Sequence, residues 1–193
     1  LAASTHPGEE EAVFEAHRLL KDSFAGLLTL LAPRHPDRGG AVRDLAAARG
    51  LNVRLRSRKG IIASDTDVYV ADTLGELGLF YRLSDVSFVG GSLTPKGGHN
   101  PLEPARLGGA ILHGPHTFNF DETYAEMRAA GGSALVRNDR ELATAVRRLL
   151  SDEKTRLVMT DAARRTAAVS AERVLAEISG VVLQRFEQHQ RAA

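Results

Sequence analysis

The sequence predicts an α/β fold, in which a Rossmann-like parallel sheet is flanked by helices and followed by a helical C-terminal tail. Two observations predict the sheet. Short apolar segments alternate with amphipathic helical segments up to Val136, the pattern of repeated β-α-β units. The segment GLLTLLA at 26–32 is continuously apolar, as strands buried on both faces usually are. A third observation predicts the tail, because the patterns beyond Asp139 are helical only.

Each element of this pattern has a local reason. Glu9, Glu10 and Glu11 occupy the first turn of a helix expected at 8–24, where the helix dipole favours acidic side chains. The helix expected at 39–50 ends on Gly50, a natural capping residue. The other helices are expected at 75–84, 100–108, 120–132, 140–152, 153–169 and 171–189. The strands are expected at 1–4, 26–32, 51–57, 67–72, 85–91, 110–114 and 133–136.

Composition restricts the classes of function. The 193 residues suit a single α/β domain, and 43% of them are hydrophobic, enough for a folded core. The 25 basic and 24 acidic residues nearly cancel and the basic ones are scattered, so no nucleic-acid partner is predicted. The absence of cysteine excludes disulfides and thiolate metal sites. No apolar run reaches the length of a membrane span and no signal peptide is apparent, so we expect a soluble chain.

The loops that follow the strands are predicted to bind a ligand. In an open parallel sheet, ligands bind beyond the carboxyl ends of the strands. Several of these loops carry glycines, cations or the first residues of a helix, and such features favour an anion. The chain has no Gly-x-Gly-x-x-Gly motif after its first strand and no phosphate loop of the P-loop type, which argues against NAD, FAD and P-loop nucleotide sites.

The segment HNPLEP at 99–104 admits two interpretations. Asn100 is a strong N-cap, Pro101 suits the first helical position, and Glu103 falls at the third. In one interpretation Glu103 folds back onto the Asn100 amide as a capping box. In the other, the helix start faces a phosphate and the Glu103 carboxylate accepts hydrogen bonds from ribose hydroxyls. The residues alone leave both open.

Two further loops are candidates for ligand binding. Arg34 follows the buried strand, and its guanidinium is well shaped for a phosphate or a base edge. A solvated cation near a turn is the alternative. Gly75 and Glu76 stand at another helix start, where simple capping by Asp72 or Thr73 is the alternative.

Two histidines, His113 and His116, flank Gly114 and Pro115 and raise the question of zinc. No third ligand with metal spacing accompanies them, and the intervening proline prevents a shared helical face. We therefore predict no metal site.

Several motifs together resemble the carboxyl-terminal half of 3-deoxy-D-manno-octulosonic acid (Kdo) transferases. The motifs are ASTHPGEEE, PRHPDR, DTLGELGLFYRLSDVSFVGGSL, GGHNPLEPARLG and GPHTFNF, in this order between Ala3 and Phe120. The resemblance implies the second domain of a two-domain GT-B glycosyltransferase. Residues 1–170 are then the domain that binds the donor, CMP-Kdo, and residues 171–193 the C-terminal helix. The acceptor-binding N-terminal domain is then absent from this chain, which agrees with the short opening strand at 1–4.

The resemblance places the nucleotide contacts in loops that the strand-end rule had already selected. These contacts are Pro33, Arg34, Gly75, Glu76, Leu77, Asn100, Pro101, Leu102 and Glu103. Candidates for contact with the sugar or phosphate are Lys96, Gly97, Gly98 and His99. The glycines of this loop are expected to let backbone amides approach the phosphate and the acidic sugar. The catalytic base belongs to the missing domain, so no catalytic residue is predicted here.

The activity implied by the resemblance is inverting, metal-independent transfer of Kdo from CMP-Kdo to a lipid A precursor in lipopolysaccharide biosynthesis. It would take place at the cytoplasmic face of the inner membrane, with no cofactor, and this chain alone is expected to be inactive. Two alternatives stay open: half of a UDP-sugar 2-epimerase, and a non-catalytic nucleotide-binding module. Preference for CMP over uridine nucleotides would favour the transferase.

The last helix is expected to lack a partner. In two-domain GT-B proteins this helix usually crosses back to the first domain. An apolar stripe of nearly helical period marks it here, formed by Val174, Ile178, Val181, Leu183 and Phe186. We therefore expect self-association or a mobile tail.

Overall fold

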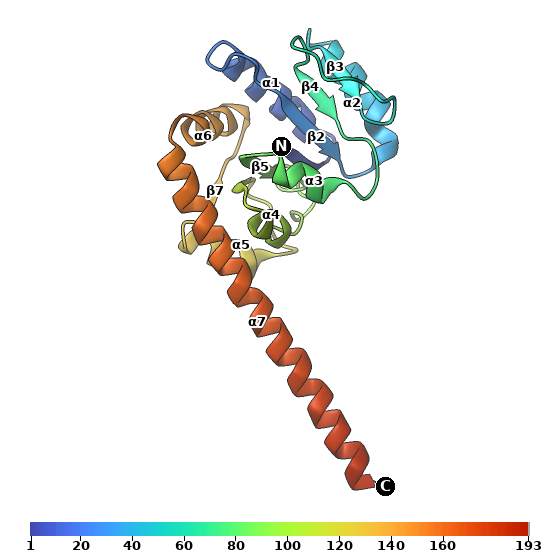
Figure 1. Ribbon diagram of the computed structural model, residues 1–193, viewed down its shortest axis with the longest axis vertical. Helices are drawn as coiled ribbons and strands as arrows, with labels where there is room; N and C mark the ends of the chain where they lie inside the picture. Colours follow the sequence, from blue (N-terminus) through green and yellow to red (C-terminus); the bar gives the residue numbers. More distant parts are fainter. Residues whose placement is uncertain (193) are drawn as a thin grey trace.

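The protein folds into a seven-stranded parallel sheet with helices on both faces, which confirms the predicted fold class (Figure 1). The structure is a computed structural model that describes the backbone of residues 1–192; the side chains of 174, 176, 177 and 180–192 are not described. The strands are β1 (Ala2–Thr5), β2 (Thr29–Pro33), β3 (Val53–Leu55), β4 (Val68–Val70), β5 (Val86–Val89), β6 (Ala110–His113) and β7 (Ser133–Leu135). The helices are α1 (Glu9–Lys21), the short 3-10 turn η1 (Pro36–Arg38), α2 (Gly39–Ala47), α3 (Leu77–Arg82), α4 (Leu102–Leu107), α5 (Asp121–Ala129), α6 (Asp139–Ser151) and α7 (Glu153–Ala192).

The order of the strands is β3-β4-β2-β1-β5-β6-β7, so the first strand of the chain lies in the middle of the sheet. Ala2 is paired with Leu31 of β2 on one side and with Phe88 of β5 on the other. The chain runs from β1 to β2 and then to β3 at the edge, and β4 fills the position between β3 and β2. It then crosses to the other side of β1 and builds outward from β5 to β7. The reversal creates a switch point between β1 and β5, where ligands of open α/β sheets bind.

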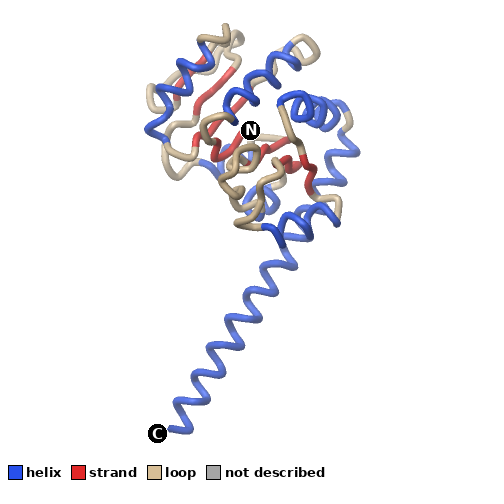
Figure 2. The backbone as a smooth tube through the Cα atoms, turned by 180° about the vertical axis from the view of Figure 1, so that it is seen from behind, coloured by secondary structure: helices blue, strands red, loops and turns tan. Residues whose placement is uncertain are grey.

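Alternate strand residues pack against the two helical layers. Leu31 of β2 joins a cluster with Phe14 of α1, Val42 of α2 and Leu142 of α6. Leu30, the preceding residue, points to the opposite face and packs near Phe80 of α3. On that opposite face, Val89 and Ile111 pack against Ala105 of α4, Met127 of α5, and Ala163 and Ala167 of α7. Figure 2 shows the strands enclosed between these layers.

The C-terminal tail is one helix where the sequence predicts two. The segments expected at 153–169 and 171–189 join without a break in α7, a helix of 40 residues. Its first half packs on α4, α5, α6 and β6, and its second half extends away from the domain (Figure 1). Ile178 of the expected stripe is 55% exposed, whereas the side chains of Val174, Val181, Leu183 and Phe186 lie outside the described residues.

In the described part of the chain, every helix is either too short or too polar to cross a lipid bilayer.

Candidate functional site

The carboxyl ends of β1, β2 and β5 meet at one edge of the sheet, around the switch point. His6 follows β1, Arg34 and His35 follow β2, and the loop 90–101 follows β5 and leads to α4. Because all neighbouring strands are parallel, these loops emerge together. The edge therefore collects histidines, cations and a helix start from segments far apart in the sequence.

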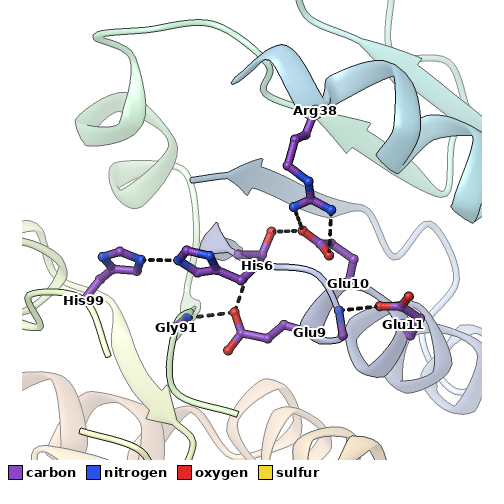
Figure 3. A network of polar contacts seen from close by, with 9 residues as sticks. His6, Glu9, Glu10, Glu11, Arg38, Gly91 and His99 are labelled. Atoms are coloured by element: carbon purple, nitrogen blue, oxygen red, sulfur yellow. Dashed lines mark hydrogen bonds and ion pairs between the residues drawn. The ribbon is translucent and has the colours of Figure 1, made fainter. Parts of the chain in front are cut away.

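A buried glutamate closes the glycine-rich turn after β5. Oε2 of Glu9 accepts a hydrogen bond from the Gly91 amide at 2.7 Å (Figure 3). Oε1 accepts bonds from the Ser92 and Leu93 amides, both at 2.9 Å. The His6 amide also donates to Oε2, at 2.9 Å. This carboxylate takes the place that an anion would take in such a turn. The backbone amides of residues 91–93 are therefore occupied within the protein.

Gly97 and Gly98 allow close packing of two loops. Gly97 has a φ of 91°, and a side-chain carbon there would lie 2.4 Å from Nδ2 of Asn119. That amide nitrogen donates to the Lys96 carbonyl at 2.9 Å. The Gly98 amide is also occupied, because it donates to a carbonyl of the preceding turn at 2.7 Å. These contacts hold the segment 96–99 against the loop after β6 and so fix the position of His99.

A second buried carboxylate beneath the edge is neutralised within the protein. Glu10 accepts a hydrogen bond from Nη1 of Arg38 at 2.7 Å and from the Thr5 hydroxyl at 3.1 Å (Figure 3). Glu10 is fully buried, and a buried carboxylate of this kind needs such partners to remain charged. Both carboxylates, Glu9 and Glu10, accept hydrogen bonds from groups of the protein, so neither is free to bind a ligand.

Two histidines from opposite sides of the switch point are joined directly. Nε2 of His6 and Nε2 of His99 lie 3.0 Å apart. The ring planes differ by only 6° and the ring centres are 5.3 Å apart, a separation that fits the nitrogen–nitrogen distance plus the two ring radii. The rings therefore meet edge to edge rather than face to face. A third imidazole, His35, stands nearly perpendicular to His6 with the ring centres 6.2 Å apart.

The environment of the pair keeps both rings neutral near neutral pH. Burial lowers the pKa of His99 to about 4, with further lowering by His6 and Arg34. Burial also lowers the pKa of His6, and Lys96 acts in the same direction while Glu9 opposes it. A nearby positive charge disfavours a second one, which is the cause of the contributions from Arg34 and Lys96.

Two cations at this edge are unpaired. In the described part of the chain, neither the Arg34 guanidinium nor the Lys96 ammonium makes a hydrogen bond or ion pair, and both side chains are exposed. The Arg34 amide donates to the Thr5 carbonyl at 3.0 Å, which fixes the backbone from which the guanidinium extends. Unpaired cations beside neutral imidazoles suit an anionic group. Pro33, which precedes Arg34, is buried as the last residue of β2.

Glu76 is bound within the protein rather than free. Its carboxylate accepts two hydrogen bonds from Arg56, at 2.6 and 3.0 Å, and another from the Thr73 hydroxyl. Arg56 and Thr73 thereby lower the pKa of Glu76 to about 2. Gly75 has a φ of 80°, a conformation that favours glycine, and Leu77 begins α3. The loop is therefore a rigid start to α3, in which the carboxylate of Glu76 serves the protein.

The start of α4 differs from a capping box. Oδ1 of Asn100 accepts a hydrogen bond from the Leu102 amide at 2.9 Å, and Pro101 occupies the N-cap position. The Glu103 side chain makes no hydrogen bond in the described part of the structure, and it is exposed. The carboxylate lies near α3, because a side-chain carbon added at Gly78 of that helix would be 3.7 Å from Oε1 of Glu103. Of the two interpretations, the capping box is absent and the free carboxylate remains.

Between α3 and α4 lies a groove of about 350 Å³. Its lining includes Asn100, Leu102 and Glu103 from α4 and its approach, together with Gly78, Arg82, Arg106 and Leu107. Asn100, one of the residues that line the groove, directly follows His99 in the sequence. Of the sequence-predicted residues, Asn100, Leu102 and Glu103 line this groove, all from the approach and start of α4.

A larger cavity, about 880 Å³, lies elsewhere, along β7, α6 and α7. It is lined mostly by apolar side chains such as Val136, Leu149 and Met159, and none of the predicted site residues lines it. Size alone therefore does not identify the site. The strand ends and the unpaired polar groups do.

His113 and His116 do not form a site. His113 is fully buried and its Nδ1 lies 2.7 Å from the Gly114 carbonyl, whereas His116 is only half-buried. Among the described residues, no group of three or more histidines, aspartates and glutamates is placed to hold a metal ion.

The residues that the sequence did not single out are His6 and His35. Both lie in motifs quoted above, THPGE and PRHPDR, directly after strands. The signal was the position of each histidine at a strand end, but pairing across the switch point depends on strand order, which the sequence pattern does not specify.

Comparison with known proteins places the chain among glycosyltransferases. No protein-family model matches it. It is 41% identical over 157 residues to the 3-deoxy-D-manno-octulosonic acid transferase of Haemophilus influenzae, covering 81% of this chain and 37% of that protein. It is 36% identical over 173 residues to the Bordetella pertussis protein of the same name, covering 88% of this chain and 40% of that protein. The chain thus spans well under half the length of these curated relatives.

Two solved structures are similar to this fold. The crystal structure of the C-terminal CMP-Kdo binding domain of WaaA from Acinetobacter baumannii superposes with a TM-score of 0.82, at 34% identity and with 86% of each chain covered. The C-terminal domain of a group 1 family glycosyl transferase, LpcC from Francisella tularensis, has a TM-score of 0.60 at 13% identity, with 88% of this chain and 82% of that chain covered. The second likeness concerns the fold alone.

Proposed function

This chain belongs to the Kdo transferase family, matching the carboxyl-terminal domain of these GT-B glycosyltransferases, and from that premise we propose that it binds CMP-Kdo. Residues 1–170 form the donor-binding domain in this proposal. The boundary to the C-terminal helix falls inside α7.

The observation that carries the proposal is the grouping of unused polar side chains at the carboxyl edge of the sheet. Arg34 and Lys96 are cations without an acidic partner in the described part of the chain. Glu103 is a carboxylate without a donor there. An anionic nucleotide with ribose hydroxyls supplies complementary partners to both kinds of group, because guanidinium suits phosphate and a carboxylate accepts from adjacent hydroxyls.

We assign the parts of the donor to three loops. The nucleoside lies along the start of α3 and α4, contacting Gly75, Glu76 and Leu77 through the backbone and Asn100, Pro101, Leu102 and Glu103 around the groove. The phosphate lies beside Pro33 and Arg34. Lys96 and His99 face the acidic sugar or the phosphate. The segment 97–98 contributes by holding His99 in position, since Gly98 donates its amide within the protein.

The chemistry assigned to this chain is orientation of the donor and stabilisation of the departing CMP. Positively charged donors held in place before the reaction stabilise the charge that develops on a leaving phosphate. Arg34 and Lys96 supply such charge without a metal ion, so donor binding is proposed to be metal-independent. The base that activates the acceptor is proposed to lie outside this chain, and the reaction of the whole enzyme is inversion at the anomeric carbon.

For the whole enzyme we propose a lipid A precursor as acceptor and the cytoplasmic face of the inner membrane as location. Nucleic acid is not a proposed partner, because the net charge is only +1 and the basic residues are scattered. The names of the curated relatives support transfer of Kdo.

Calorimetric titration tests this function. The chain is titrated with CMP, UMP and AMP, with and without a metal chelator. We expect binding of CMP, weaker binding of UMP and AMP, and no effect of the chelator. Arg34→Ala should weaken binding roughly tenfold or more, since a charged hydrogen bond is lost. Arg43→Ala, in a partly exposed arginine of α2 that pairs with Asp44, is the matched control. Preference for UMP would favour a UDP-sugar enzyme instead.

A further inference from the structure

The hydrogen bond between His6 and His99 restricts the protons that the two rings hold. A neutral imidazole has one nitrogen that donates and one that accepts, whereas an imidazolium donates from both. At 3.0 Å between the Nε2 atoms, one ring donates and the other must keep a lone pair (Figure 3). The pair therefore holds either two protons, as a neutral unit, or three, as a singly charged cation. Four protons would break the bond.

The outward nitrogens of the pair are available to a ligand. Neither Nδ1 makes a hydrogen bond in the described part of the structure. Neither belongs to the fully buried polar atoms that lack a partner, so both are accessible. In the neutral pair only one Nδ1 carries a proton. A third proton adds to the other Nδ1 and leaves the shared bond intact, which creates two outward donors and one positive charge.

The charged groups around the pair disfavour a third proton, so the pair is neutral when no ligand is bound. On the β2 side these are Arg34 and His35, and on the β5 side Lys96, all of which oppose a further positive charge. Tyr124 of α5 donates its hydroxyl proton to the His99 carbonyl at 2.7 Å and so contacts the backbone rather than the ring.

From α1, two glutamates favour the charged form of His6. Glu9 is engaged by four backbone amides and Glu10 by Arg38, so neither lies free beside the ring. Burial outweighs their effect and the pKa of His6 is lowered.

We propose that the His6–His99 pair is a proton-coupled receptor for the phosphodiester of the nucleotide-sugar donor. Binding of the phosphodiester draws one proton from solvent onto the free Nδ1 of the pair, and the resulting cation donates to the phosphate. This inference rests on the proposed function and assigns to His6, together with His99, a positioning role toward the leaving phosphate. An anion compensates the positive charges of Arg34 and Lys96, which removes the main electrostatic opposition to the third proton.

The test uses a ligand that cannot itself take up the proton. Free CMP titrates near neutral pH, because the second pKa of a phosphate monoester is about 6. The methyl ester of CMP is a phosphodiester, like the donor, and stays singly charged. Calorimetric titration at about pH 6.5, near the ordinary pKa of histidine, in two buffers of different ionisation enthalpy gives the number of protons taken up. Cytidine, without phosphate, and free Kdo, with only its carboxylate, are the comparison ligands.

We expect net proton uptake with the methyl ester and none with cytidine or free Kdo. For a bound-state pKa of about 7, affinity for the methyl ester should rise roughly tenfold between about pH 8 and about pH 6. His6→Asn and His99→Asn should each abolish the uptake and flatten the pH dependence. His116→Asn, in a half-buried histidine outside the pair, should behave like the wild type. Histidine nitrogen chemical shifts of the wild-type protein, recorded with and without the methyl ester, follow the same proton without any substitution.

The outcomes separate the two proposals. If the methyl ester binds without proton uptake and the histidine shifts stay those of neutral rings, the receptor is overturned and donor binding stands. If free Kdo causes the uptake, the pair faces the carboxylate and the assignment to the phosphate is wrong. If neither CMP nor its ester binds, the proposed function and this inference fall together.

Discussion

Oε2 of Glu9 lies 2.7 Å from the Gly91 backbone nitrogen, so that the first helix of the chain closes the turn after the fifth strand. The bond spans the switch point of the sheet. Ser92 and Leu93 donate to the same carboxylate, and Gly91 has a φ of 70°, in the left-handed region. The shape of the loop that carries Lys96 and His99 therefore depends on a side chain from the other half of the sheet.

Substitution of Glu9 should destabilise the domain. Glu9→Ala leaves the buried amides of Gly91 and Ser92 and the partly buried amide of Leu93 without an acceptor, and we expect a loss of about 2–4 kcal/mol in the free energy of unfolding. Urea unfolding measures it. Glu15→Ala, in a partly exposed glutamate of the same helix that pairs with Arg18, should change stability by less than about 0.5 kcal/mol. Equal stability of the two variants would contradict the role given to Glu9.

Glu103 should affect ligand binding and not folding. Its carboxylate makes no hydrogen bond in the described structure, so Glu103→Ala and Glu103→Gln should leave the melting temperature nearly unchanged. Loss of charge-assisted bonds to ribose should weaken CMP binding roughly tenfold to a hundredfold. Calorimetry and thermal unfolding are measured together, with the exposed Glu122→Ala as control. Variants that bind CMP normally would show that the nucleotide lies elsewhere.

The Arg56–Glu76 pair should make stability depend on acidic pH. The pKa of Glu76 is about 2 in the folded protein, below its ordinary value of 4.5. A depressed folded-state pKa gives stability that is present above the unfolded value and is lost as pH falls toward the folded value. The stability difference between wild type and Glu76→Gln should therefore be constant above about pH 4.5 and shrink toward pH 2.

Two arginine variants test the same pair. Arg56→Ala should reproduce the behaviour of Glu76→Gln, because each removes the ion pair. Arg54→Ala, whose contact with Asp65 is longer at 3.7 Å, is the control and should show no such dependence. Chemical unfolding at a series of pH values gives the measurement. A difference that grows on acidification would contradict the assignment.

The chain by itself should not transfer Kdo. It spans 37% of the Haemophilus influenzae relative, and the proposed acceptor site and base lie in the remainder. Incubation with CMP-Kdo and a lipid A precursor should give no transfer above the hydrolysis of the donor, even though CMP binds. Turnover by this chain would show that the division of labour between the two domains is wrong.

Removal of residues 180–193 should cost little stability. The contacts of α7 with the sheet involve its first half, where Ala162, Ala163 and Ala167 are buried. We therefore expect the shortened chain to unfold within a few degrees of the full one. Deletion from 160 onward, which removes these buried alanines, should prevent stable folding. Thermal unfolding followed by circular dichroism distinguishes the two.

The sequence predicted the elements well and the contacts of the site only in part. The strand segments stand out from the helical segments because strands buried on both faces are continuously apolar. All seven observed strands overlap the segments predicted for them. The break expected near residue 170 is absent, since nothing in AVSAER stops a helix. The hydrogen-bond partners of two carboxylates could not be predicted. Glu9 and Glu76 lie in helix-start motifs, but their partners Gly91 and Arg56 are distant in sequence.

The position of β1 in the centre of the sheet has a consequence for how the chain acquires its structure. Ala2 needs Leu31 on one side and Phe88 on the other, so the middle of the sheet cannot be completed until the chain has been made as far as Phe88. The loop-closure entropy of such pairing must be paid before its contacts form, so folding that depends on it is slow compared with that of helical bundles. During synthesis β1 should therefore stay unpaired on its β5 side until that strand emerges, and an unpaired strand edge of this kind is prone to aggregation.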